Sequence, residues 1–359
     1  MPAIRTILLL LLATGVHAAP PELSIGATLP LSGPRLEQGQ MVQDGLQVAL
    51  MEAGPALRKR IRLELMDDGG DPATAARNAE RLIVQGQVQA LVGCVGEAAC
   101  AAVEAVARRH QVPLLGAVNA NAAVCREKSL AFCFHTPYAA EAEAIARQLG
   151  TLGARSVHLW LSEELAGYAP DVAAVFEAHK LAVSRHQPGK AAGTPAFPGA
   201  TGRPDEAHVF FLNNADAVAA SRSLRQRQPG ALAAALSTVE PFRWLQQTQG
   251  ISTGMLVAHS MPNPDLAKSR LAKAYQKAIS SFATFNLPYE YSQLEIYLVG
   301  RLLTQLAERG VADRQALARA LLQNEYHIDD FTVAFPNGRR TLSVPVGLSV
   351  VSRNGVLLE

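Results

Sequence analysis

The 359-residue sequence has little net charge, few cysteines and, beyond its first residues, no long hydrophobic run. A formal charge of +2 argues against the basic surface that binders of nucleic acid or anionic membranes carry. The cysteines form no CxxC and no HExxH is present, which argues against a zinc site. GxGxxG and GxSxG are missing too, so neither a dinucleotide site nor a hydrolase elbow is indicated. We therefore expect no cofactor, no metal and no enzyme activity, and a small molecule as the partner.

The longest apolar run lies at the N-terminus, where residues 7–12 follow a single Arg and precede small residues. This order is typical of a secretory signal peptide, here with cleavage after Ala18. The run is too short to span a bilayer. No cysteine precedes Cys94, which argues against a lipid anchor. We expect residues 1–18 to direct export, and the rest to be a soluble periplasmic monomer that does not insert into the membrane.

Four cysteines in an exported chain favour disulfides, for which three pairings exist. Cys125 and Cys133 flank a short polar loop that returns to an apolar strand, and we predict that they pair. Cys94 and Cys100 straddle a strand-to-helix turn, where a second bridge would brace the loop. The alternative is that all four cysteines are buried free thiols. The spacing of the cysteines in the sequence does not give the distances between their Cα atoms, on which a disulfide depends.

The segment from Gln89 to Asn121 predicts a βαβ unit. An apolar run at 90–92 breaks at 93–96, an alanine-rich segment with helical spacing follows, and a second apolar run at 112–115 opens into GAVNAN. Parallel strands joined by a helix end on the same edge of a sheet, where open α/β sheets bind ligands. We expect the loops 94–98 and 116–121 to lie side by side there, the first at a helix N-terminus suited to an anion.

The same alternation of strand and helix extends along the chain and predicts parallel, doubly wound sheets. Further strands are expected at 22–30, 61–66, 130–135, 156–161, 208–212, 231–236 and 254–258. Helices are expected at 37–52, 73–84, 172–179, 217–227 and 293–308, with another containing Glu141, Ile145 and Leu149. Proline-marked breaks near Pro137 and Pro262 divide the alternation into two series. We therefore predict two lobes, 19–136 plus 262–329 and 137–261 plus 330–359, that close by a hinge on a cleft.

Several segments together resemble the type I periplasmic solute-binding proteins of ABC importers, the Leu/Ile/Val-binding family. They are IGATLPLSG, LELMDDGGDPATAARNAERLI, LVGCVGEAA, VPLLGAVNAN and SQLEIYLVGRLLTQLAERG. The resemblance covers the whole mature chain and implies two lobes joined by a multi-crossover hinge, with the ligand held between them. By position it implies a ligand site made of Gly96, Glu97, Ala98, Asn119, Ala120, Tyr138, Tyr168, Asn213, Ser237, Thr238 and His259.

Three of these positions depart from the family. Relatives commonly carry Ser or Thr where Glu97, Ala98 and Ala120 stand, and those hydroxyls help to bind the carboxylate of an amino acid. Glu97 would oppose a carboxylate in a closed cleft.

Each side chain also has a structural alternative. Glu97 suits a helix start, Asn119 suits a loop and Tyr138 suits packing at the crossover. Ser237 and Thr238 suit a turn or a cap, while Tyr168 and His259 suit structural roles.

The resemblance implies a substrate-binding component that delivers a small polar solute, such as an amino acid, amide or organic acid, to an inner-membrane ABC permease. The alternative is a ligand-sensing module that acts on a separate membrane receptor. A hydrolytic enzyme has less support because no activated nucleophile is recognisable.

Overall fold

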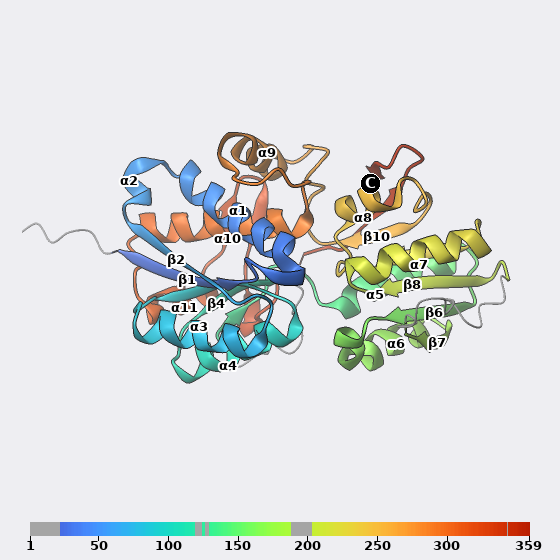
Figure 1. Cartoon of the computed structure of the whole chain (residues 1–359), viewed down its shortest axis with the longest axis horizontal. Helices are drawn as coiled ribbons and strands as arrows, with labels where there is room; N and C mark the ends of the chain where they lie inside the picture. Colours follow the sequence, from blue (N-terminus) through green and yellow to red (C-terminus); the bar gives the residue numbers. More distant parts are fainter. Residues whose placement is uncertain (1–21, 119–123, 126–128, 188–202, 343) are drawn as a thin grey trace, which may run out of the picture.

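The computed structural model describes residues 22–118, 124–125, 129–187, 203–342 and 344–359. The predicted signal peptide, Asn119 and Ala120 lie outside the described residues. Two lobes stand side by side, each built on one sheet (Figure 1). Among the described helices none combines the length and the apolar character that a membrane span requires.

The sheet of the first lobe contains parallel strands only. Its order is β2–β1–β3–β4–β5, with bounds Ile61–Asp67, Leu23–Leu29, Ala90–Val95, Leu114–Val118 and Ala131–Phe132. The helices that connect these strands are α1 (Leu36–Glu52), α2 (Gly54–Arg58), α3 (Pro72–Val84) and α4 (Glu97–Arg109). The start of α3 follows the sequence closely, since the Asp71 carboxylate accepts the Thr74 N–H and Pro72 occupies the first helical position.

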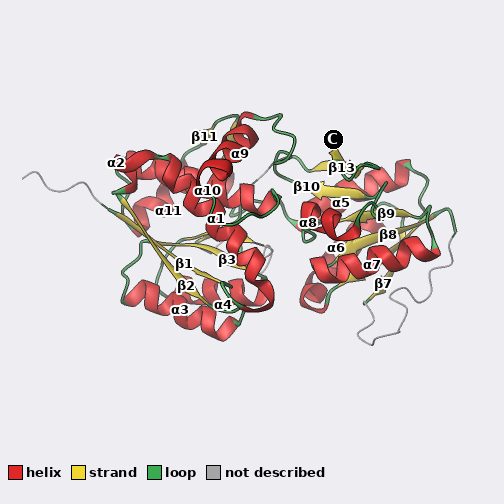
Figure 2. Cartoon of the chain, turned by 45° about the horizontal axis from the view of Figure 1, so that its top comes forward, coloured by secondary structure: helices red, strands yellow, loops and turns green. Residues whose placement is uncertain are grey.

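Helices cover both faces of this sheet (Figure 2). Helices α3 and α4 lie on one face, whereas α1 packs on the other face against α10 (Tyr291–Glu308). The close approach of α1 and α10 requires glycine, because a Cβ at Gly300 would lie 2.5 Å from the Cβ of Ala49. Around α10 lie α9 (Arg270–Phe282), α11 (Arg314–Gln323) and the hairpin of β11 (Tyr326–Ile328) and β12 (Phe331–Val333).

The sheet of the second lobe is mixed at one edge. Its order is β14–β13–β10–β9–β8–β6–β7, with bounds Leu357–Leu358, Gly347–Val351, Leu256–His259, Leu232–Ala235, Glu206–Phe211, Ser156–Leu161 and Ala182–His186. The strand β13 pairs antiparallel with both of its neighbours, β10 and β14, whereas β10, β9, β8, β6 and β7 pair in parallel. Helices α5 (Tyr138–Thr151) and α6 (Ala169–Ala178) pack on one face, and α7 (Asn214–Arg227) and α8 (Pro241–Thr248) on the other.

The chain passes between the lobes three times, before α5, after β10 and before β13. The last passage differs from the predicted boundary at 329/330. The strand β12 pairs with β11, and Thr341 forms a bridge to Cys133 next to β5. The structure therefore keeps residues 330–342 beside the first sheet, because their backbone hydrogen bonds are made there.

The predicted βαβ unit is present, but its strands are longer at their carboxyl ends. The strand β3 continues through Gly93 to Val95, and only Gly96 breaks it, with φ at +85°. The strand β4 includes Gly116 to Val118. The loop between β3 and α4 is therefore shorter than predicted, and Glu97 already belongs to the helix.

Candidate functional site

The carboxyl ends of the strands in both lobes face one another across a seam. On the first lobe this edge carries Glu97 after β3 and Val118 at the end of β4. On the second it carries the segments 162–168 after β6, 212–214 after β8, 237–240 after β9 and 259–261 after β10. Since parallel strands of open sheets present their ligand loops at this edge, the seam is the candidate site.

A cavity of about 30 Å³ lies in the seam and receives side chains from both lobes. The first lobe contributes Val118, His135, Tyr291, Ser292 and Glu295, and the second contributes Ser237, Val239, Glu240, Pro241, Ala258, His259, Ser260 and Met261. A volume of this size holds one or two water-sized groups. A larger solute therefore needs the lobes to move apart.

Three side-chain contacts hold the lobes together in front of this cavity. Arg35 pairs with Glu164, and Glu37 pairs with Arg243. The hydroxyl of Tyr168 donates a hydrogen bond to Glu97. Each ion pair has side chains that are partly accessible to solvent, and surface pairs contribute about 0–1 kcal/mol each, so breaking the two pairs is inexpensive.

Glu97, which we predicted as either a ligand contact or a helix start, begins a helix and also lies on the seam. It is the first residue of α4, and its carboxylate is 9% exposed and lies on the seam. Gly96 precedes it with a positive φ, and a Cβ there would lie 2.6 Å from the guanidinium of Arg35. Glycine at position 96 therefore lets Arg35 approach the backbone beside Glu97.

Tyr138 and Tyr168 complete a small aromatic cluster with Glu97. The ring of Tyr138 lies 5.6 Å from that of Tyr168 and 4.9 Å from that of Phe211, both edge-on. Tyr138 is 4% exposed, and its hydroxyl has no hydrogen-bond partner in the described part of the chain. Burial and the neighbouring carboxylates of Glu97 and Glu141 raise the pKa of Tyr138 well above its ordinary value, so the phenol is neutral.

Other predicted site residues already use their polar atoms within the protein. Asn213 caps α7 by accepting the Asp216 N–H at 2.9 Å, and Thr238 donates to the Leu212 carbonyl at 2.9 Å. The ring of His259 bonds Met261 and Ser349 at 2.9 Å each. Ala98 is exposed.

Ser237 is held by a buried carboxylate that sequence reasoning did not assign to the site. Its N–H and hydroxyl donate to Glu141 at 2.9 and 2.6 Å. Burial raises the pKa of Glu141 to about 7, against the lowering effect of these two bonds. One signal for this position is its spacing, because Glu141 lies on the same helical face as Ile145 and Leu149.

Two further buried carboxylates, Glu240 and Glu295, line the cavity, and a third, Glu290, lies beside Glu240; all were missed as site residues. Burial raises the pKa of Glu240 to about 7, and burial and its neighbour Glu240 raise that of Glu290 well above 4.5. Glu295 lies 3.2 Å from Nδ1 of His135. Burial acts to lower the pKa of His135, but the Glu295 carboxylate outweighs it and the net shift is upward.

Comparison with known proteins assigns this arrangement to a family. Residues 22–343 match the family model described as periplasmic binding protein. The chain belongs to the periplasmic binding protein family. A comparison with curated protein sequences finds no match.

Solved structures agree with the family and give the fold as that of the type I periplasmic binding proteins. A possible leucine/isoleucine/valine-binding protein from Rhodopirellula baltica superposes with a TM-score of 0.78 at 20% identity, over 95% of this chain and 97% of that one. A branched-chain amino acid transporter substrate-binding protein from Streptococcus pneumoniae, in complex with isoleucine, superposes with a TM-score of 0.78 at 19% identity, over 94% of this chain and 97% of that one. An ABC transporter solute-binding protein from Rhodopseudomonas palustris, in complex with 3,4-dihydroxybenzoic acid, superposes with a TM-score of 0.78 at 16% identity, over 94% of this chain and 95% of that one.

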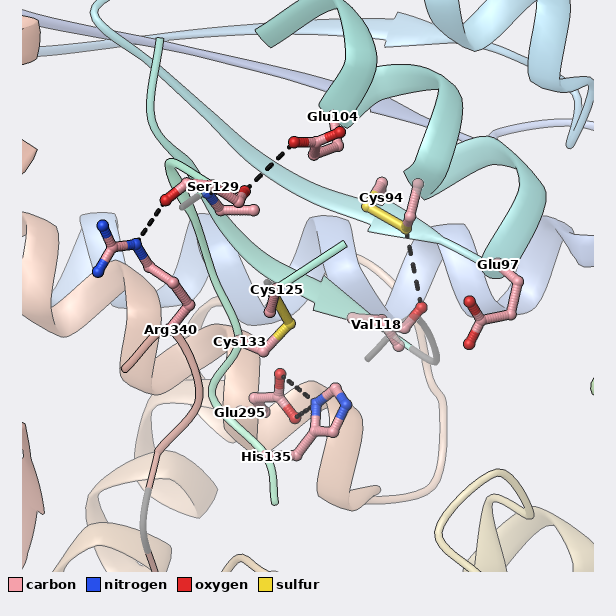
Figure 3. The surroundings of a disulfide bond; sticks show 12 residues. Cys94, Glu97, Glu104, Val118, Cys125, Ser129, Cys133, His135, Glu295 and Arg340 are labelled. Carbon is pink, nitrogen blue, oxygen red and sulfur yellow. Dashed lines mark hydrogen bonds and ion pairs between the residues drawn. A yellow bond between two sulfur atoms is a disulfide. The ribbon is translucent and has the colours of Figure 1, made fainter. Parts of the chain in front are cut away.

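This periplasmic binding protein contains both predicted disulfides, and each adjoins a strand end that faces the seam (Figure 3). Cys94 and Cys100, with Cα atoms 5.3 Å apart, join the end of β3 to the first turn of α4 and so enclose Glu97. Cys125 and Cys133, 6.0 Å apart, tie the chain after β4 to the segment that leads to His135.

Metal ligation finds no support in the described ranges, where no group of three or more His, Cys, Asp or Glu side chains is placed to hold an ion. The chemistry that the seam of this binding protein offers is hydrogen bonding, aromatic contact and negative charge.

Proposed function

We propose that this protein is the substrate-binding component of an ABC importer and captures a small polar organic solute between its lobes. The observation that carries the proposal is the cavity at the carboxyl edges of both sheets, because a ligand there touches the two lobes at once. The structural neighbours crystallised with isoleucine and with 3,4-dihydroxybenzoic acid support a ligand of similar size.

The mechanism is differential binding. A ligand that contacts both lobes favours the closed state by the contacts that the open state lacks. We propose that an inner-membrane permease recognises the closed monomer in the periplasm, after residues 1–18 have directed export. The solute is bound and released unchanged, without catalysis.

Tyr138 is the side chain that we place against the ligand with the strongest structural reason. A buried hydroxyl without a partner is unfavourable, and a ligand acceptor or donor at that point would satisfy it. We also assign Glu97, Tyr168 and Ser237 to the ligand surface because they line the seam near Tyr138. Asn119 and Ala120 keep the place in this surface that the family resemblance implies.

The test is thermal unfolding of refolded, ligand-stripped protein against a library of amino acids, amides, amines and carboxylic acids. A ligand at one hundred times its dissociation constant adds roughly 2.7 kcal/mol to the stability of the folded state. We expect at least one selective solute, bound without turnover and with a fall in the radius of gyration. Turnover of the solute, or no binding across the library, would contradict the proposal.

A matched pair of variants locates the site. Tyr138→Phe removes only an unpartnered hydroxyl, so stability should hold while affinity for the selected solute falls. Tyr326→Phe removes a hydroxyl that bonds Ala320 in the first lobe, away from the seam, and should leave affinity unchanged. Equal affinities in both variants would move the ligand away from Tyr138.

A further inference from the structure

The buried ionisable side chains around the seam are predominantly acidic. Five carboxylates, each at most 9% exposed, lie within or beside it: Glu97, Glu141, Glu240, Glu290 and Glu295. In the described part of the chain only one buried cationic partner accompanies them, the imidazole of His135. Recognition of an amino acid requires partners for one negative and one positive group. The buried carboxylates of this seam favour a positive group only.

The natural place for a ligand carboxylate is already taken. The N-terminus of α4 is such a place, since its free N–H groups attract anions. The carboxylate of Glu97 stands at that helix start, buried and bonded to Tyr168 of the other lobe. A second carboxylate beside it would meet a like charge in a poorly solvated space.

The two arginines at the seam already form ion pairs within the protein. Arg35 pairs with Glu164 and Arg243 pairs with Glu37, each across the two lobes. A ligand carboxylate would have to break one of these pairs to obtain an arginine partner. Apart from the imidazole of His135, which Glu295 engages, the described residues at the seam give an anionic ligand no vacant partner of opposite charge.

The cavity itself offers acceptors. Glu240 and Glu295 line it, together with the ring of His135. His135 is 6% exposed, its Nδ1 is engaged by Glu295, and its Nε2 has no partner in the described chain. A volume of about 30 Å³ accommodates one ammonium or one end of an amidinium group.

We propose that the solute is a small organic cation, with an ammonium or amidinium group and no carboxylate, whose charged group lies in the cavity against the carboxylates of Glu240 and Glu295. The inference rests on the proposed function and adds the charge class of the ligand to it.

Proton release should accompany binding. Glu240 faces Glu290, Glu295 and Arg243, and also Ser292 at the start of α10. Burial raises its pKa to about 7, so at pH 6 most molecules carry a proton there that a cation would displace. For one displaced proton, affinity for the cation should rise about tenfold from pH 6 to pH 8. A carboxylate ligand would show no such rise.

The experiment compares probes that share a skeleton and differ in charge. The first set is 3-methylbutylamine, leucine and 4-methylpentanoate; the second is phenethylamine, phenylalanine and 3-phenylpropanoate; agmatine adds a guanidinium. Calorimetry at pH 6 and pH 8 should show amines binding at least about tenfold tighter than the matched acid and amino acid, and tighter at pH 8. An acid or amino acid that binds tighter than its amine overturns this inference and leaves the proposed function standing. Failure of every charge class in the library overturns both.

Two buried glutamates provide the matched variants. Glu240→Gln removes the charge at the cavity, and affinity for the best amine should fall about tenfold or more, with the pH dependence reduced. Glu104→Gln alters an equally buried carboxylate that bonds Ser129 within the first lobe, and affinity should not change. An unchanged affinity in Glu240→Gln overturns the placement. If that variant fails to fold, the pH dependence of the unaltered protein decides, because its absence also overturns the placement.

Discussion

The two lobes present similar strand ends to the seam but fasten them by different means. In the first lobe, disulfides join 94 to 100 and 125 to 133, next to β3 and β5. In the second, the strand ends are held by side-chain hydrogen bonds: Ser162 donates to Asp216 at 2.6 Å and accepts from the Asn213 N–H at 3.0 Å. One side of the seam is covalently braced, and the other depends on polar contacts.

The difference matters because the two devices act on different states. A disulfide stabilises mainly by restricting the unfolded chain, whatever the pH between 5 and 8. A hydrogen bond adds about 0.5–1.5 kcal/mol to the folded state, and one to a carboxylate depends on that group's ionisation. We therefore expect the first lobe to respond to reductant and the second to pH.

The largest effect should come from reduction of the first lobe. The closed loops span separations of only 6 and 8 residues, for which the chain-entropy relation gives about 2.5 kcal/mol each and about 5 kcal/mol together. Both tryptophans, Trp160 and Trp244, lie in the second lobe, so their fluorescence reports that lobe alone. With reductant present, the unfolding transition seen by circular dichroism should move to a lower urea concentration. The transition seen by tryptophan fluorescence should keep nearly the same urea midpoint as without reductant. Equal displacement of both signals would show that the lobes unfold as one unit.

The next effect is a pH dependence from Glu141. Its folded-state pKa of about 7 lies above the ordinary 4.5, so from about pH 4.5 to 7 the unfolded chain releases a proton that the folded protein keeps. Stability should therefore fall as pH rises through this window, by up to about 1.4 kcal/mol per pH unit for this group.

Glu141→Gln should flatten this slope in urea titrations from pH 5 to pH 8. Glu143→Gln is the control, because Glu143 lies on the same helix with its side chain 45% exposed and pairs with His179. An unchanged slope in Glu141→Gln would assign the pH dependence to other groups.

A smaller effect is expected from the helix caps of the two lobes. Asn213→Ala removes the cap of α7 and should lower stability by about 1 kcal/mol, seen in the tryptophan signal. Asp313→Ala removes the equivalent cap of α11 in the first lobe, where the Asp313 carboxylate accepts the Ala316 N–H at 2.8 Å. That variant should move the circular dichroism transition more than the fluorescence. The reverse pattern would contradict the division of the signals between lobes.

The smallest effect should come from the ion pairs that cross the seam. Glu37→Gln and Glu164→Gln each weaken one pair with an arginine, and surface pairs contribute at most about 1 kcal/mol. We expect unfolding to change little, while small-angle scattering of the ligand-free protein shows a larger radius of gyration. Added salt should enlarge the unaltered protein in the same direction. A radius that is insensitive to both would mean that other contacts close the seam.

Much of the fold was predictable because strongly periodic segments reveal themselves locally. The run at 22–30 became β1, the helix expected at 73–84 became α3, and the segment 293–308 became α10. The alternation of strand and helix did not reveal α9 and α11, which belong to no βα repeat, or α8, a short helix between β9 and β10. The helix α9 does carry its own signal, since Leu271, Tyr275 and Ile279 recur at helical spacing.

The site was predictable only in part. The family resemblance implied Ser237, Tyr168 and Glu97, and the structure brings all three to the seam. It also engages Asn213 and Thr238 within the protein, which their residue types alone could not show, because the same groups serve caps and ligands.

The sequence by itself determined the family, most of the order of strands and helices, and the edge of each sheet that faces the seam, because side-chain periodicity and turn chemistry are local. Only the tertiary structure decided which groups oppose one another in the cleft. Tyr168 meets Glu97, and Arg243 meets Glu37, across separations of many residues and between separate lobes. Such pairings arise from how the packed lobes are oriented. Burial also raises the pKa of Glu141 and Glu240, which no local pattern in the sequence records.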